Sequence, residues 1–324
     1  MVDITVLQQS AEQMTEIDQS FDLVYMDPPF GLQREFSMLE EDGEKKSFSD
    51  RWDSYDDYIT WYADIVNKAW SLMNKNSWLY LHNNFIGNAL VLSQVTPEVR
   101  NAFYTNISWK RSGPKNNIKN GWGNIVDSIM VIRKGNPFFQ VEYTNLDPKY
   151  ERNSFKNKDD RGYYALAKTS GEKSRVGRMF EYKGYNPQYG WRVSEDMLKD
   201  MDTEKMLHYG KNILYKKIYL DDNKGVPVQN LWDDVYFISR SEQNKRKYPT
   251  QKPLKLLERI VTTSCPNDGW VFDPFAGSGT TAIASQLHNR NCITCDINPQ
   301  SISLTKDALN NQTSTLTEHM NDNN

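Results

Sequence analysis

The sequence is poor in the residues that make disulfides and metal sites. It has three cysteines and four histidines among 324 residues, and apart from one C-x-x-C pair none of them fall at spacings typical of zinc ligands. An odd number of cysteines excludes a complete disulfide framework and fits a reducing compartment. Cys292 and Cys295 form a C-x-x-C pair in a predicted strand, where residues three apart point to opposite faces. We therefore expect no structural metal.

Long apolar runs and a secretory leader are also absent. No stretch approaches the roughly 18 apolar residues that a membrane span requires. Residues 1–10 lack a basic cluster followed by an apolar core, which predicts a cytoplasmic protein with no membrane partner. The net charge of −3 excludes a strong overall attraction to nucleic acid, so the distribution of charge matters more than its sum.

Strands and helices alternate in the first part of the chain. A β-branched and aromatic run at 21–26 ends at Asp-Pro-Pro, and a strand must end there because proline cannot donate to a ladder. Apolar residues spaced by three and four over 55–73 predict an amphipathic helix. Further strands are predicted at 78–81, 105–109 and 128–132. This order predicts a wound α/β sheet.

A segment rich in Tyr, Lys, Arg, Gly and Asn interrupts the alternation at 145–245. Regular patterning then resumes, with a helix at 253–264, a strand at 270–273, a glycine turn, a helix at 279–288, a strand at 292–296 and a helix starting at Asn298-Pro299. The polar tail from Asn310 onward is predicted to be disordered. We therefore divide the chain into 1–144, 145–247, 248–309 and 310–324.

The segment 270–281 has the pattern of a strand, a tight Gly-x-Gly turn and a helix start. Such a turn lets backbone approach a nucleoside-type ligand and points helix N–H groups at it. Asp273 could face a cationic ligand group, and Asp296, which ends the next strand, could accept hydrogen bonds from ribose hydroxyls. The missing Gly-Lys-Ser/Thr ending and third glycine disfavour ATPase and dinucleotide-binding sites. An ordinary β-α-β turn remains the alternative.

The tetrapeptide Asp27-Pro28-Pro29-Phe30 follows the first long strand. Exocyclic amines of adenine and cytosine are poor nucleophiles because the nitrogen lone pair is delocalised into the ring. The Asp27 carboxylate and the Pro28 carbonyl could each accept one N–H and localise that lone pair as it attacks a sulfonium methyl. Phe30 offers a face on which a flipped base can stack. The alternative is a strand-terminating turn with no catalytic role.

Together these motifs resemble those of DNA amino-methyltransferases, which carry Asp-Pro-Pro-aromatic and Phe-x-Gly-x-Gly sequences. The order, with Asp27–Phe30 before Phe275–Gly279, is similar to the permuted beta class of bacterial and phage enzymes. The stretch at 248–254 is similar to the one ahead of that class's cofactor loop, and 183–191 and 225–232 look like segments of site-specific adenine methylases. The resemblance covers most of residues 20–300.

The resemblance implies a Rossmann-like S-adenosylmethionine-dependent methyltransferase sheet with an inserted irregular target-recognition region. It implies that the target base is bound and activated by Asp27, Pro28, Pro29 and Phe30. It implies that S-adenosylmethionine is held by Lys252, Asp273, Pro274, Phe275, Ala276, Gly277, Ser278, Gly279, Thr280 and Asp296. The chain departs from the pattern at residues 8–11, Gln-Gln-Ser-Ala, where such enzymes often have Gly-Asp. Contacts from there to the cofactor adenine therefore stay unassigned.

Basic charge gathers at 149–192, which holds 11 Lys or Arg and 5 Asp or Glu, a net charge of +6 (11 − 5). Aromatic residues suited to stacking or to packing on sugars interleave with it: Tyr163, Tyr164, Tyr182, Tyr185, Tyr189 and Trp191. The basic side chains can meet phosphates. We predict that this segment contacts double-stranded DNA, with an ordinary solvated surface as the alternative.

The expected activity is N6-adenine methylation within a short sequence of duplex DNA. N4-cytosine methylation is the alternative, but that group more often has Ser-Pro-Pro-aromatic, so Asp27 favours adenine. Methylation of a protein amide or of RNA is disfavoured, since those enzymes usually carry Asn-Pro-Pro-Tyr after the cofactor loop. The intact motifs disfavour a DNA-binding module without catalysis. A homodimer and a cognate restriction enzyme stay open as partners.

Overall fold

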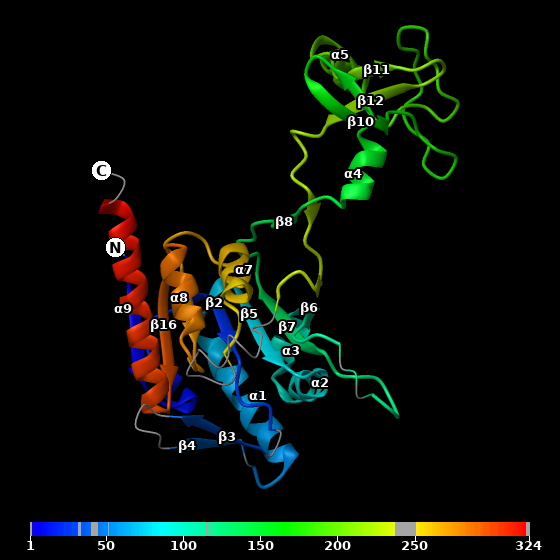
Figure 1. Ribbon diagram of the computed structural model, residues 1–324. Helices are drawn as coiled ribbons and strands as arrows, with labels where there is room; N and C mark the ends of the chain where they lie inside the picture. Colours follow the sequence, from blue (N-terminus) through cyan, green and yellow to red (C-terminus); the bar gives the residue numbers. More distant parts are fainter. Residues whose placement is uncertain are drawn as a thin grey trace. The chain divides into compact units, whose positions relative to one another are not determined.

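The structure is a computed structural model that describes residues 2–31, 34–39, 45–50, 52–114, 116, 118–236 and 251–321, with the backbone alone at 34–39, 45–50 and 312–321. The chain forms two compact units (Figure 1). Unit 1 comprises Met1–Glu142 and Val228–Asn324, and unit 2 comprises Tyr143–Pro227. No helix within the described ranges is long and apolar enough to cross a membrane.

Unit 1 is built on an eight-stranded sheet with the order β1-β16-β15-β2-β5-β7-β6-β14. All neighbours pair in parallel except β7, which is antiparallel to both β5 and β6. The strands are β1 (Ile4–Gln8), β2 (Phe21–Met26), β5 (Met73–Asn83), β6 (Phe103–Lys110), β7 (Val126–Lys134), β14 (Leu231–Trp232), β15 (Trp270–Asp273) and β16 (Asn291–Asp296). The predicted α/β sheet is confirmed.

The reversed strand β7 departs from the alternation of strands and helices that the sequence suggested. A parallel neighbour would need a crossover of a dozen or more residues, usually a helix. Residues 111–125 contain three glycines and a proline, and the residues that the structure describes in this connection between β6 and β7 form neither helix nor strand. The chain therefore turns back as an antiparallel hairpin.

Helices cover both faces of this sheet. One face packs against η1 (Ala11–Glu16), α1 (Tyr55–Leu72), α2 (Phe85–Gln94) and α3 (Pro97–Asn101), and the other against α7 (Leu254–Ser264), α8 (Thr280–Leu287) and α9 (Pro299–Asn321). Cys295 is buried on the first face and Cys292 on the second, which confirms the orientation predicted for the C-x-x-C pair. Strands β3 (Arg34–Leu39) and β4 (Lys45–Asp50) pair antiparallel in a separate two-stranded sheet.

The disorder expected for the polar tail from Asn310 stays a prediction, and the structure shows the backbone of the last helix extending into that tail. Helix α9 starts at Pro299, as expected, and continues to Asn321. Neither glycine nor proline occurs between these two ends to stop the helix, although the sequence there is polar.

Unit 2 has a small sheet with the order β11-β12-β10-β9 and a two-stranded ribbon, β8-β13. Its elements are β8 (Tyr143–Thr144), α4 (Pro148–Ser154), β9 (Asn157–Asp159), β10 (Gly162–Lys168), α5 (Glu195–Thr203), β11 (Leu207–Tyr209), β12 (Leu214–Tyr219) and β13 (Val226–Pro227). The unit ends before residue 247, the expected boundary, because β14 returns to the main sheet beside β6.

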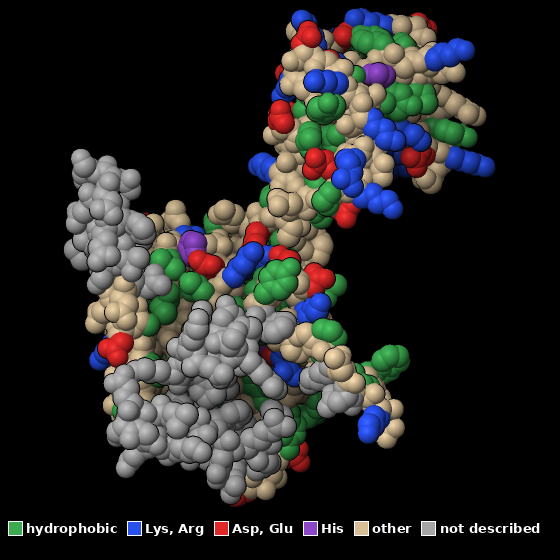
Figure 2. Space-filling view, in the orientation of Figure 1, with side chains coloured by type: hydrophobic (Ala, Val, Ile, Leu, Met, Phe, Trp, Pro, Cys, Tyr) green, Lys and Arg blue, Asp and Glu red, His purple; other side chains and the backbone are tan. Residues whose placement is uncertain are grey.

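Part of the aromatic set expected to stack on DNA instead forms the core of unit 2. Trp191 is 1% exposed, Tyr182 7% and Tyr164 6%. Trp191 stacks on Phe180 and donates its indole N–H to the Phe180 carbonyl at 2.8 Å. Tyr163 stays half-exposed, and Figure 2 shows Lys and Arg side chains spread over the visible face of this unit. The expectation of stacking was therefore wrong for the three buried rings.

Arg259 of α7 links the two segments of chain between which unit 2 is inserted. Its buried guanidinium pairs with Glu142 at 2.9 Å and with Asp234 at 2.6 Å, and these residues lie just before and just after the insertion. The Val228 N–H also donates to the Glu142 carbonyl. One buried cation thus holds both segments of chain together.

We expect Arg259→Met to lower the free energy of unfolding by about 2–3 kcal/mol, because it leaves two partly buried carboxylates without their partner. Urea unfolding followed by circular dichroism measures the change. The matched control is Arg192→Met, which breaks an exposed pair with Glu172 and should cost less than about 1 kcal/mol. Equal small losses in both variants would contradict the role of Arg259.

Candidate active site at the carboxyl edge of the main sheet

The two sequence motifs meet at one edge of the sheet. Strands β2, β5, β15 and β16 are parallel, so their carboxyl ends lie together. This arrangement brings Asp27, which follows β2, near Asp273 and Asp296, which end β15 and β16. Crevices outside the carboxyl ends of parallel strands are where α/β proteins bind ligands.

The turn after β2 is held against α1. Gly31 has φ of +66°, and a Cβ at this position would lie 2.7 Å from the Tyr58 ring. Only glycine fits both restrictions without strain. Pro28 is buried, whereas Asp27 and Phe30 keep partial exposure. The turn therefore presents a carboxylate and an aromatic ring from a restrained backbone.

Lys252 connects this turn with the glycine turn. Its ammonium donates a hydrogen bond to the Asp27 carboxylate and lies 5.6 Å from the centre of the Phe30 ring. Its backbone carbonyl accepts a long hydrogen bond, 3.5 Å, from the Thr280 hydroxyl. Lys252 was expected among the cofactor-binding residues, and in the structure its side chain contacts the residue expected to activate the base.

The glycine turn has the conformation that its sequence requires. Gly277 and Gly279 have φ of +52° and +76°, and a Cβ on Gly279 would lie 2.6 Å from Thr305 of α9. The Gly277 N–H donates to the Asp296 carboxylate at 2.9 Å. The other residues expected here lie in the same turn: Pro274 and Ala276 are buried, and the hydroxyls of Ser278 and Thr280 are 3.0 Å apart.

The carboxylates give this edge an excess of negative charge. Asp273 accepts hydrogen bonds from the Phe275 N–H at 2.9 Å and the Thr281 hydroxyl at 2.6 Å. Burial, assisted by the charges of Asp27 and Asp296, nevertheless raises the pKa of Asp273 to about 7. Burial also raises the pKa of Asp296. A cationic ligand would relieve this repulsion.

A second polar chain runs behind Asp27. The Tyr25 hydroxyl is 2.7 Å from Nδ1 of His82, and Nε2 of that ring is 3.4 Å from Asp127. Asp127 also pairs with Arg111 at 2.6 Å. Burial raises the pKa of Asp127, but the hydrogen bond to His82 and the charges of His82 and Arg111 outweigh it and hold the pKa below its usual value. Nδ1 of His82 is 4.0 Å from Asp27.

Sequence reasoning missed three residues around the turns. His82 belongs to a strand end whose neighbours become evident only in the sheet. Trp61 of α1 packs its ring 6.0 Å from the ring of Phe275. The hydroxyl of Tyr62 is buried and has no hydrogen-bond partner among the residues that the structure describes. The amphipathic pattern of 55–73 marks these two positions as helix surface or core and gives no sign of a ligand.

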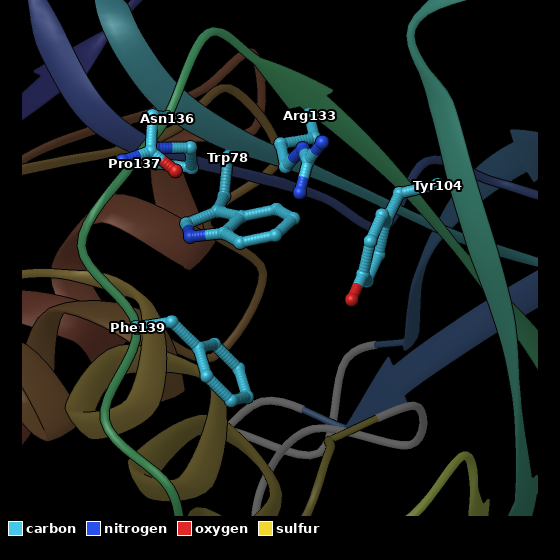
Figure 3. A pocket seen from close by; sticks show the side chains of 6 residues that line it. All are labelled: Trp78, Tyr104, Arg133, Asn136, Pro137 and Phe139. Atoms are coloured by element: carbon cyan, nitrogen blue, oxygen red, sulfur yellow. The ribbon is translucent and has the colours of Figure 1, made fainter.

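A small pocket of about 140 Å³ lies elsewhere in unit 1 (Figure 3). Its lining consists of Trp78, Tyr104, Arg133, Asn136, Pro137 and Phe139. The Arg133 guanidinium lies 5.0 Å from the centre of the Tyr104 ring. None of the residues at the carboxyl edge contribute to it. Within the described residues, no group of three or more His, Cys, Asp or Glu side chains could hold a metal ion.

With this geometry established, comparison with known proteins identifies the family. A model of the DNA methylase family that covers N6 and N4 enzymes matches residues 21–307. The chain belongs to this family. It is 26% identical over 289 residues to the type II methyltransferase M.EcaI of Enterobacter cloacae, covering 85% of this chain and 61% of that protein.

Two further comparisons show how far the likeness extends. The chain is 24% identical over 313 residues to the Mod subunit of the type III restriction-modification enzyme StyLTI of Salmonella typhimurium, covering 83% of this chain and 46% of that protein. The chain thus spans about half to three fifths of the length of these two relatives. The solved M1.HpyAVI–SAM complex has a TM-score of 0.48 at 15% identity, covering 94% of this chain and 100% of that one.

The raised pKa of Asp273 leads to a prediction about stability. Between the usual value of 3.8 and about 7, the folded protein holds a proton that the unfolded chain releases. This carboxyl therefore makes stability fall as the pH rises through that window. Asp273→Asn cannot ionise, so its melting temperature relative to the parent protein should increase between pH 4 and pH 7.

Scanning calorimetry at several pH values measures this difference. The exposed Asp53→Asn serves as the control, and its melting temperature relative to the parent should stay level. If the melting temperature of Asp273→Asn relative to the parent were also independent of pH, Asp273 would not be held neutral by its surroundings.

Proposed function

We propose that this protein transfers a methyl group from S-adenosylmethionine to the exocyclic N6 of adenine in duplex DNA. The observation that carries this proposal is the position of Lys252. Its side chain contacts Asp27, and its carbonyl accepts a hydrogen bond from Thr280. The turn to which we assign base activation and the turn to which we assign the cofactor therefore lie at one edge, although they are far apart in sequence. Membership of the DNA methylase family supports methyl transfer to DNA and includes both N6 and N4 enzymes.

The residues of this edge fit S-adenosylmethionine. When bound, that cofactor supplies an electrophilic methyl group on a positively charged sulfur. The carboxylates of Asp27, Asp273 and Asp296 favour a ligand that carries sulfonium and ammonium charges. The buried hydroxyl of Tyr62 offers a further hydrogen bond to a ligand. We propose that the glycine turn holds the cofactor, with Asp296 accepting from its ribose.

We propose that the Asp27 carboxylate and the Pro28 carbonyl accept the two N–H groups of the target amine. This interaction concentrates the lone pair on the nitrogen, which attacks the methyl carbon as the carbon–sulfur bond breaks. The nitrogen gains a methyl group and loses one proton, which Asp27 accepts. Lys252 occupies one side of this carboxylate and keeps it oriented, which leaves the other side for the base.

A base inside a duplex cannot reach this edge, so the target must be extruded. Enzymes that act on a base atom flip the nucleotide into a pocket and stack it on an aromatic or apolar side chain. Phe30 supplies such a ring, 6.1 Å from the centre of the His82 ring. We propose that the basic surface of unit 2 contacts the DNA around the site, and that the protein acts in the cytoplasm.

We expect Asp27→Ala to reduce methyl transfer below detection, because the amine loses the group that localises its lone pair. Cofactor affinity should stay within about tenfold, a free-energy change of about 1.4 kcal/mol. Transfer of a labelled methyl group to unmodified plasmid DNA and calorimetric binding of S-adenosylmethionine measure the two effects. Asp64→Ala, on the exposed surface of α1, is the control. Normal turnover by Asp27→Ala would refute the assigned role.

The modified base is predicted to be N6-methyladenine, since Asp27 replaces the serine more often found in N4-cytosine enzymes of the family. Treated DNA is digested to nucleosides and analysed by mass spectrometry, and sequencing of the treated DNA gives the recognition site. N4-methylcytosine as the sole product would leave the methyltransferase assignment standing and overturn the choice of adenine.

A further inference from the structure

The connection between β6 and β7 leaves the sheet at the same edge as the site. Residues 111–125 follow Lys110, the last residue of β6, and lead into Val126, the first residue of β7. Ser128 of β7 pairs with Asn83, the last residue of β5. In Figure 1 the connection extends from the ends of β6 and β7 away from the body of unit 1.

The root of this connection, meaning Arg111, Asn124 and Ile125 next to the two strands, contacts the polar side chains behind Asp27. The backbone N–H of Arg111 donates to the Ile125 carbonyl at 3.0 Å. The Arg111 side chain pairs with Asp127 at 2.6 Å and reaches the Asn124 carbonyl at 3.4 Å. Because Asp127 contacts His82, the root is positioned by the same residues that lie next to the Asp27 turn.

The far part of the connection presents an indole ring entirely to solvent. Trp122 is 102% exposed and is flanked by Gly121 and Gly123. Ile118 is 48% exposed, and its terminal carbon would lie 2.5 Å from a Cβ on Gly123. Tryptophan has the largest apolar surface of any side chain, so leaving it in water is unfavourable unless a partner covers it.

The charge of the connection indicates what that partner is. Residues 109–125 contain four Lys or Arg and no Asp or Glu, in a chain whose net charge is −3. Lys119 is exposed and lies three residues before Trp122 in sequence. Basic side chains beside an exposed aromatic ring suit phosphates next to bases, the surface that nucleic acid offers. A protein or membrane partner has no reason to meet the chain at the edge that must receive the target base.

We propose that residues 118–125 dock on duplex DNA beside the target base, with Trp122 stacked on the bases and Lys119 at a phosphate. This inference rests on the proposed function, because it needs DNA at the carboxyl edge. Extruding a base leaves neighbouring bases unstacked, and an aromatic ring placed against them replaces part of the lost stacking. Trp122 thereby assists extrusion without touching the reacting atoms.

The test compares Trp122→Ala with the parent protein on a duplex that contains the mapped methylation site. We expect the dissociation constant for DNA to rise about 10- to 100-fold, in line with the loss of one base–aromatic stack. The dissociation constant for S-adenosylmethionine should change less than twofold. Trp122→Phe should recover most of the affinity. Tyr104→Ala, another exposed aromatic residue but at the start of β6, is the matched control and should behave as the parent.

A second duplex, with a mismatched partner opposite the target base, tests the stacking role. Its base is already loosened, so the defect of Trp122→Ala should shrink at least about threefold. In parallel, Lys119→Gln should lower the slope of log affinity against log salt by about 0.9. An undiminished defect on the mismatch would overturn the stacking role, and an unchanged salt slope would overturn the phosphate contact.

The outcomes separate this inference from the proposed function. If the parent protein methylates DNA and Trp122→Ala binds and methylates it equally well, the docking of this connection is refuted and the function stands. If the parent methylates no DNA, the function itself fails. Binding to phosphatidylserine vesicles that depends on Trp122, with DNA binding unaffected, would assign the surface to a membrane and overturn the inference.

Discussion

The contact between Lys252 and Asp27 is the interaction on which the site depends. It joins the turn after β2 to the segment that leads into α7, and the carbonyl of the same lysine meets Thr280 in the glycine turn. Burial raises the pKa of Asp273, and the charges of Asp27 and Asp296 add to this effect, so a cation near these three carboxylates is favourable. Lys252 offsets part of this charge and leaves the remainder for a cationic ligand.

The strand order of the main sheet allows the contact between Lys252 and Asp27 to form. Parallel strands deliver their carboxyl ends to one edge, and the reversed strand β7 brings Asp127 to the same edge from the opposite chain direction. Asp127, His82 and Arg111 then link the β6–β7 connection to the turn that carries Asp27. The same polar chain thus supports both the proposed base-activating carboxylate and the proposed DNA-docking segment.

The inserted unit shows which structural features composition predicts and which it does not. Its basic charge and its separation from the main sheet were evident from the sequence, and the insertion is closed by Arg259 between Glu142 and Asp234. Composition could not distinguish exposed aromatic rings from buried ones. Trp191 and Tyr182 pack into the core because a small unit needs large apolar side chains to exclude water.

By itself, the sequence determined several elements of the main sheet, the helices at 55–73 and 253–264, and the two motifs, because periodicity, prolines and glycines act over a few neighbouring residues. The strand at 21–26, the helix at 55–73 and the Gly-x-Gly turn needed no distant partner to be recognised. Only the tertiary structure decided that Lys252 contacts Asp27, that His82 joins Asp127, and that Trp122 stays uncovered. Those relations depend on the order and direction of strands far apart in the chain, which local patterns do not encode.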